Sequence, residues 1–136
     1  MKKNVLFICT HNAARSQMAE GFLNALYGER YEAFSAGIEP GEVNPYAITV
    51  MAEVGIDISQ HRSKSLDEFH GKQFDFVVTV CDYAKEVCPF FPGKSILHKN
   101  FRDPSKHHGC NNVILQEIRR IRDDIKDWII NTFNHK

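Results

Sequence analysis

The sequence has no excess of charge of either sign, since its 136 residues include 17 basic and 17 acidic side chains. This balance argues against a protein that holds nucleic acid or an anionic membrane surface through bulk charge. An apolar run long enough to cross a membrane is also missing. The short apolar run after Lys3 soon gives way to polar residues and is not a secretory signal. We therefore expect a cytoplasmic protein, with neither nucleic acid nor membrane among its partners.

Cysteine is scarce as well, with four residues in the chain. Four thiols without a secretory signal predict a reducing compartment, where cysteines are catalytic, metal-binding or simply buried. Internal repeats and low-complexity segments are missing too. A chain of this length is sufficient to bury a core, and we expect one domain over residues 1–136.

Short apolar runs alternate with helical patterns along the chain. The runs predict strands at residues 5–8, 31–36, 75–80 and 95–98, and the helical spacing predicts helices that end at Gly28, begin at Asn44-Pro45, and begin near Val113. Residues 65–70 are expected to form a short helical piece. The arginines of the last helix alternate with acidic residues, which indicates a solvated face. The alternation predicts an α/β fold: a doubly wound, four-stranded parallel sheet with helices on both faces.

The first strand, loop and helix are the most informative stretch. The apolar run from Val5 to Ile8 is typical of a buried parallel strand, and Cys9 follows it directly. A tight loop between a strand and a helix gathers backbone N–H groups around one point, with the positive end of the helix dipole behind them. This predicts an oxyanion site. Its residues are Thr10, His11, Asn12, Ala13, Ala14, Arg15 and Ser16.

The side chains at the two ends of this loop suit that chemistry. Cys9 lies at the mouth of the site, where the helix dipole favours its thiolate form. Arg15 offers a planar fork to two oxygens of a tetrahedral anion. Ser16 is placed either to cap the helix or to donate to the sulfur. A cysteine after an apolar run is often a small buried hydrophobe, but its place between strand and helix favours catalysis.

A second thiol is expected at the same place. Asp75 to Val80 is the strongest strand pattern in the chain, and Cys81 follows it. Ligands of open α/β sheets bind beyond the carboxyl ends of the strands, so Cys9 and Cys81 are predicted to face one crevice. The alternative is a core thiol, but Cys81 stands just outside its apolar run.

Together these residues resemble the thioredoxin-coupled arsenate reductases, which are built on the low-molecular-weight protein tyrosine phosphatase fold. The resemblance covers nearly the whole chain and implies reduction of arsenate to arsenite, with thioredoxin as the reductant and no metal or organic cofactor. The segments that carry it are Cys9 to Gly21, Ser35 to Ile38, Val43 to Pro45, Val54 to Ser59, Val78 to Cys81, Cys88-Pro89 and Asp103-Pro104.

The resemblance also assigns roles to residues. Cys9 is the nucleophile, Cys81 forms a transient disulfide with Cys9, and the final disulfide joins Cys81 to Cys88. Asp103 is the general acid, although an aspartate before a proline is by itself typical of a turn or a helix cap. A tyrosine phosphatase would need Cys9, Arg15 and Asp103 but neither of the other two cysteines. A regulatory module that binds arsenic or phosphate would need no catalysis. The pair Cys81 and Cys88 favours the reductase, which we expect to be a monomer.

The chain departs from the family pattern at several positions. His11 replaces a frequent glycine, and Ala14 stands where some members have a further cysteine. The segment from Ser105 to Asn112 is longer than usual and is expected to be a surface insertion, because it lacks metal-ligand spacing. It contains His107, His108 and Cys110.

Some family members also bind potassium beside the loop. The matching residues are Asn12, Glu20 and Ser35, together with an aspartate on a connector whose position Lys64 occupies here. An ammonium group at this position would repel the ion and could pair with Glu20 instead. We therefore expect no potassium requirement, unless Lys64 points to solvent.

Overall fold

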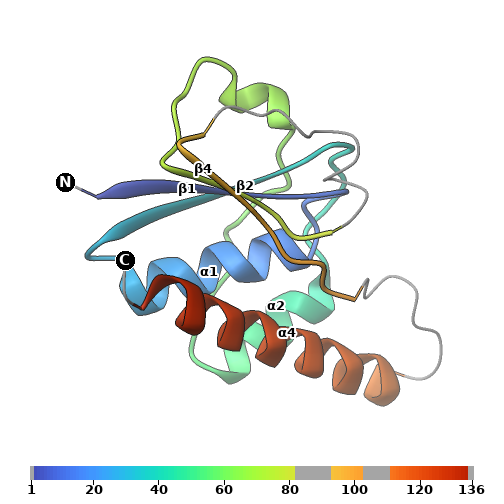
Figure 1. Cartoon of the computed structure of the whole chain (residues 1–136). Helices are drawn as coiled ribbons and strands as arrows, with labels where there is room; N and C mark the ends of the chain where they lie inside the picture. The colour runs from blue at the N-terminus through green and yellow to red at the C-terminus, as the bar shows by residue number, and fades with distance from the viewer. Residues whose placement is uncertain (1, 82–92, 103–110, 135–136) are drawn as a thin grey trace.

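The computed structural model describes residues 2–81, 93–102 and 111–134. Figure 1 shows its elements wound around one sheet. In chain order they are β1 (Lys3–Cys9), α1 (Arg15–Tyr27), β2 (Tyr31–Gly37), α2 (Pro45–Glu53), the 3-10 helix η1 (Leu66–Phe69), β3 (Phe76–Thr79), β4 (Ser95–His98) and α4 (Asn111–Phe133).

The four strands form a parallel sheet in the order β2-β1-β3-β4, as the sequence predicts. β1 lies in the middle, and its residues from Val5 to Ile8 are fully buried, which agrees with their continuous apolar run. Cys9 ends β1 and is paired in register with Gly37 of β2. The carboxyl ends of the strands therefore bring the loops after β1, β2 and β3 to the same edge of the sheet.

The two faces of the sheet are covered by different elements. Phe7 packs edge-on against Phe133 of α4, with their ring centroids 6.4 Å apart. Phe34 points to the opposite face, where its ring lies 5.8 Å from those of Phe69 in η1 and of Phe74. Figure 1 shows α1, α2 and α4 on one side of the sheet and η1 on the other. The predicted α/β architecture is thus confirmed.

The predicted element boundaries are close to the observed ones. Asn44 caps α2, because its side chain accepts a hydrogen bond of 2.8 Å from the N–H of Tyr46, and Pro45 is the first helical residue. Gly28 follows the last residue of α1, and α4 begins at Asn111. Among the described residues, no helix is long and apolar enough to span a membrane.

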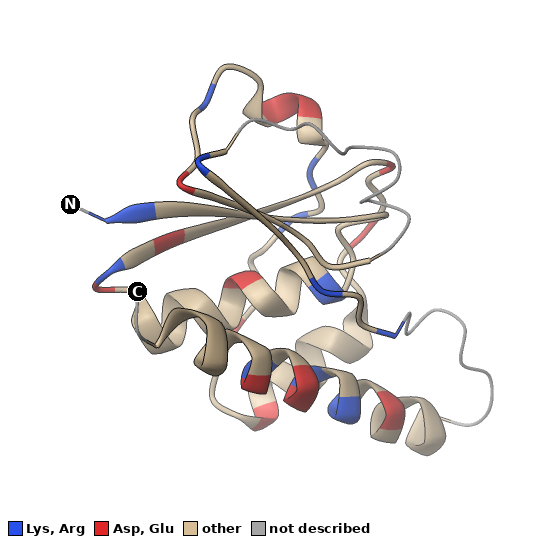
Figure 2. Cartoon of the chain, in the orientation of Figure 1, with Lys and Arg blue, Asp and Glu red and all other residues tan. Residues whose placement is uncertain are grey.

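The last helix departs from the expectation of a solvated charged face. Figure 2 shows basic and acidic residues interspersed along α4, but two of its arginines bind α2. Arg119 pairs with Glu53 at 2.7 Å, and Arg122 pairs with the same carboxylate at 2.9 Å. Arg122 is buried and also donates to the carbonyl of Val50 at 2.9 Å. These two residues therefore hold the helices together, which the charge pattern alone did not show.

Candidate functional site

The loop between β1 and α1 is held from outside by the segment that follows β2. The carbonyls of Cys9, Thr10, His11 and Ala13 accept hydrogen bonds from backbone N–H groups of residues 38–44, at 2.8–3.1 Å. In a planar trans peptide the following N–H points the opposite way from the carbonyl. The N–H groups after these carbonyls therefore point into the loop, as an oxyanion site requires. They belong to Thr10, His11, Asn12 and Ala14.

The sulfur of Cys9 lies inside this loop and receives two donors. The backbone N–H of Asn12 donates to it at 3.1 Å, and the hydroxyl of Ser16 lies 2.8 Å from it. That hydroxyl accepts a hydrogen bond of 2.7 Å from the Asn12 side chain, so its own proton is available to the sulfur. α1 begins at Arg15, which places its positive end behind the same sulfur. These contacts surround the sulfur of Cys9 with hydrogen-bond donors, which suits a sulfur nucleophile.

The structure decides between the two roles predicted for Ser16. The residue before α1 is Ala14, and no side chain caps the helix. Ser16 is fully buried and bonds to Cys9 instead. It is therefore a donor to the sulfur and not a helix cap.

Arg15 is buried at the base of the loop. Its guanidinium donates to the carbonyl of Phe101 at 3.2 Å, which ties the start of α1 to the segment after β4. One of its five donors is occupied in this way. The remaining donors of the fork suit two oxygens of a tetrahedral anion.

Cys81 follows β3 and reaches the same loop. Its sulfur lies 3.4 Å from the hydroxyl of Thr10, the residue next to Cys9. Both thiols are free and buried. The sequence prediction that two distant cysteines meet at one edge of the sheet agrees with this contact.

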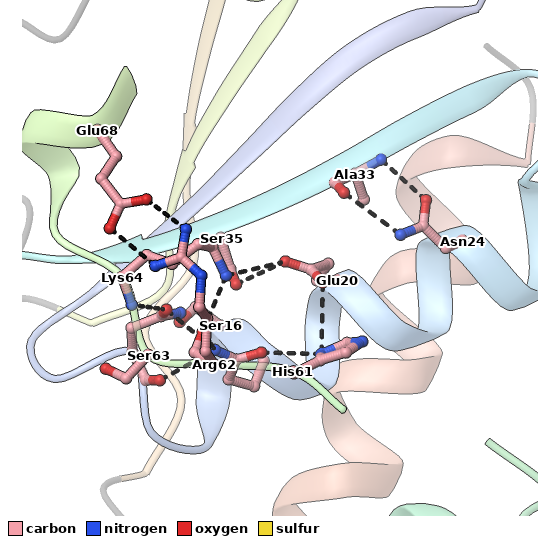
Figure 3. A network of polar contacts seen from close by, with 12 residues as sticks. Ser16, Glu20, Asn24, Ala33, Ser35, His61, Arg62, Ser63, Lys64 and Glu68 are labelled. Atoms are coloured by element: carbon pink, nitrogen blue, oxygen red, sulfur yellow. Dashed lines mark hydrogen bonds and ion pairs between the residues drawn. The ribbon is translucent and has the colours of Figure 1, made fainter. Parts of the chain in front are cut away.

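A polar network behind the loop links it to the connector between α2 and η1 (Figure 3). Glu20 accepts a hydrogen bond of 2.7 Å from Ser35 and lies 3.3 Å from the ring of His61. The ammonium of Lys64 lies 3.9 Å from Glu20, and its side chain is 14% exposed. Lys64 therefore does not point to solvent. Burial lowers the pKa of Lys64, and the carboxylate of Glu20 partly opposes this effect.

Other residues of this network were missed by the sequence reasoning. Gln17 is fully buried and contacts Asn12, His61 and the carbonyl of Arg62. Ser63 donates to the carbonyl of His11 at 2.7 Å. A polar residue at a buried position of α1 is the signal that could have drawn attention to Gln17.

The predicted loop residues are brought together, while other predicted residues cannot be placed. His11 is exposed at the rim, and its ring nitrogen Nδ1 donates to the carbonyl of Glu39 at 2.8 Å. Cys88, Asp103 and the insertion lie outside the described residues. Their predicted roles stay predictions. The same holds for the three residues of the insertion, His107, His108 and Cys110.

Comparison with known families adds an independent finding. Residues 4–113 match the family model of the low molecular weight phosphotyrosine protein phosphatases. This range contains the loop, Cys81, and all elements up to the start of α4.

Individual relatives and solved structures are similar over almost the entire chain. An arsenate reductase of Staphylococcus epidermidis is 44% identical over 137 aligned positions, which cover 99% of this chain and 98% of the relative. A solved arsenate reductase in its oxidized state superposes with a TM-score of 0.84, at 30% identity, over 98% of both chains. A thioredoxin-dependent arsenate reductase of Corynebacterium glutamicum gives a TM-score of 0.65 at 31% identity, over 96% of this chain and 63% of that one.

Proposed function

The chain belongs to the low molecular weight phosphotyrosine protein phosphatase family, and we propose that it reduces arsenate to arsenite with Cys9 as the nucleophile. Near full-length similarity to arsenate reductases places the chain among the enzymes of this family. The finer proposal concerns the residues that act and the order in which they do so.

In the first step, arsenate occupies the loop from Thr10 to Arg15. The inward N–H groups and the Arg15 fork neutralise its oxygens, as they would for any tetrahedral oxyanion. The Cys9 thiolate attacks arsenic and displaces one oxygen. Asp103 protonates this oxygen, which leaves as water. The product of the step is arsenic(V) bound to the sulfur of Cys9.

In the second step, the thiolate of Cys81 attacks the sulfur of Cys9. The electron pair of the sulfur–arsenic bond goes to arsenic, so arsenic(V) becomes arsenic(III) and leaves as arsenite. A Cys9–Cys81 disulfide remains. The thiolate of Cys88 then attacks Cys81, which frees Cys9 and leaves a Cys81–Cys88 disulfide. An external dithiol, for which we propose thioredoxin, reduces this disulfide and restores the enzyme.

The observation that carries the proposal is the position of Cys81. Phosphoester hydrolysis requires a nucleophile, an arginine and an acid, but it requires no second thiol. Here a second free thiol lies 3.4 Å from the Thr10 hydroxyl, one residue from the nucleophile. A relay that moves an electron pair through sulfur has a use for this thiol, and a phosphatase or a phosphate-binding regulatory module has none.

The test is arsenate-dependent oxidation of NADPH in the presence of thioredoxin and thioredoxin reductase. The wild-type chain should turn over continuously, and Cys9→Ser should abolish turnover. Cys88→Ser should release one equivalent of arsenite and stop as a Cys9–Cys81 disulfide, detected by mass spectrometry of peptides. Cys110→Ser, which removes the cysteine outside the relay, serves as the matched control and should keep full turnover.

The same variants separate the proposal from a tyrosine phosphatase. Hydrolysis of p-nitrophenyl phosphate should depend on Cys9 and Arg15 but persist in Cys81→Ser. Arsenate reduction should be lost in Cys81→Ser. Efficient phosphatase activity without arsenate reduction would identify the chain as a phosphatase. Anion binding without either activity would identify a regulatory module. Sustained thioredoxin-coupled turnover by Cys88→Ser would show that the relay ends at another thiol.

A further inference from the structure

We infer that Gln17 is a positioning residue of the oxyanion loop, which keeps the N–H of Asn12 directed at the Cys9 sulfur. Gln17 is fully buried on α1, one residue after Ser16. It has no place in the steps proposed above and touches neither sulfur. Its effect would be exerted through Asn12.

The contacts of Gln17 converge on Asn12. The side-chain amide N–H₂ of Gln17 donates its two protons to three acceptors, so that one proton is shared. The acceptors are the side-chain oxygen of Asn12 at 2.9 Å, the carbonyl of Arg62 at 2.9 Å and the backbone carbonyl of Asn12 at 3.1 Å. The oxygen of Gln17 accepts from the ring of His61 at 2.9 Å. A single side chain thus clamps the loop to the connector.

Asn12 is a residue that needs such a clamp. Its φ is 52°, and among the described residues it is the one non-glycine with a positive φ. This left-handed conformation is less favourable for a residue with a side chain, although asparagine tolerates it better than most. The same residue places its N–H 3.1 Å from the sulfur of Cys9. Two hydrogen bonds from Gln17 to the oxygens of Asn12 hold it there.

The remaining bonds of Asn12 do not replace this clamp. Its side-chain oxygen also accepts from the N–H of Lys64 at 2.8 Å, and its side-chain nitrogen donates to Ser16. Both bonds fix the side chain, whereas Gln17 also binds the backbone carbonyl. The peptide before Asn12, which carries the N–H, is also held at the carbonyl of His11 by Gly41 and Ser63. Loss of Gln17 frees the peptide that follows Asn12, so its effect on the N–H is transmitted through relaxation of the left-handed backbone of Asn12.

The test measures the thiol directly. It rests on the proposed function only in taking Cys9 as the nucleophile, because alkylation by iodoacetamide needs no arsenate. The rate of alkylation is followed from acid to alkaline pH in the tryptic peptide Asn4–Arg15, which contains Cys9 as its single cysteine and excludes position 17. Gln17→Met keeps the length of the side chain and removes its donors. It should raise the midpoint of the alkylation curve by about one pH unit, since one hydrogen bond to a charged group is lost.

Asn24 provides a matched control on the same helix. Its side-chain amide bonds to the backbone of Ala33 in β2, accepting at 2.9 Å and donating at 3.3 Å, away from the loop (Figure 3). Asn24→Leu removes a pair of part-buried bonds from the same helix and should lower the melting temperature without moving the midpoint.

The outcomes are distinct. A folded Gln17→Met protein with an unchanged midpoint would overturn the inference, and so would an equal shift in Asn24→Leu, which would indicate general loosening of α1. Should Gln17→Met not fold, Gln17→Leu, which is also neutral and without donors, decides by the same criterion. Failure of the proposed function would appear instead as a wild-type protein that alkylates normally but does not reduce arsenate.

Discussion

Gly37 allows the oxyanion loop to lie against the end of β2, and we predict that Gly37→Ala damages the site. A Cβ atom at this position would lie 2.8 Å from the nitrogen of Asn12, 2.9 Å from the carbonyl carbon of His11 and 2.9 Å from the carbonyl oxygen of Thr10. All three atoms are backbone atoms of the loop. No side chain can rotate away to relieve the contact, so the loop itself must move.

The size of the movement sets the size of the effect. Ordinary contacts between such atoms are about 3.5 Å, so the loop must shift by roughly 0.6 Å. Overpacking of this kind costs about 1–3 kcal/mol in the free energy of unfolding, or about 4–12 °C in melting temperature for a chain of this size. Because misplacement of catalytic groups by about 1 Å can cost 100-fold in rate, we expect kcat/KM for arsenate to fall by about tenfold or more.

The assay is the thioredoxin-coupled reaction combined with thermal unfolding. Gly41→Ala is the control, because Gly41 also bonds to the loop, at 3.1 Å from its N–H to the carbonyl of His11. Apart from its two chain neighbours, a Cβ on Gly41 would meet no atom of the described residues within 4 Å, so this variant should keep both stability and kcat/KM. A Gly37→Ala protein with the stability and kcat/KM of the wild type would refute the argument that the loop is packed against this backbone.

Three further predictions concern the charged groups around the loop. Arg15→Lys should lower kcat/KM by about 100-fold without unfolding the protein, because an ammonium cannot replace the two-pronged guanidinium; steady-state kinetics with a circular dichroism control would show this, and near-normal kcat/KM would contradict it. Exchange of potassium for sodium at constant ionic strength should leave activity and melting temperature unchanged, because the Lys64 ammonium lies 3.9 Å from Glu20 and would repel a cation there. A clearly higher activity or melting temperature in potassium than in sodium would refute the prediction. Burial lowers the pKa of Lys64 in the folded protein. Between this lowered pKa and the pKa of an unfolded lysine, about 10.4, the unfolded chain binds more protons than the folded one. The contribution of Lys64 to the free energy of unfolding should therefore rise with pH through this window. Chemical denaturation at several alkaline pH values should show the rise in wild type relative to Lys64→Met, and a pH-independent difference would contradict it.

The sequence was sufficient to predict the fold and the position of the two thiols, Cys9 and Cys81, because both predictions depend on local sequence patterns. The apolar run before Cys9 and the helical spacing after Ser16 predict a strand and a helix without tertiary information. The rule that parallel strands end at one edge then brings Cys81 to the same place. Neither inference requires knowledge of how side chains pack.

The arginines of α4 show where such local reasoning fails. Their alternation with acidic residues predicts a solvated face, but Arg122 is buried and pairs with Glu53 of α2. Charge patterning describes neighbours along one helix, whereas this pair depends on how two helices cross. Long-range partners of this kind are set by packing, which the sequence pattern does not contain.

The pattern of the sequence can draw attention to Gln17, but the partners of its side chain could not be predicted, for the same reason. Cys9, Asn12 and Ser16 lie close together in the sequence, and the hydrogen bonds between them form within one tight loop. The left-handed conformation of Asn12 is instead held from a connector far along the chain, through the N–H of Lys64 and through Gln17, which also binds the carbonyl of Arg62. The short motif therefore does not form an oxyanion site by itself. A distant segment must also supply these bonds. The fold contributes to the chemistry by bringing the connector at residues 61–64 to the loop.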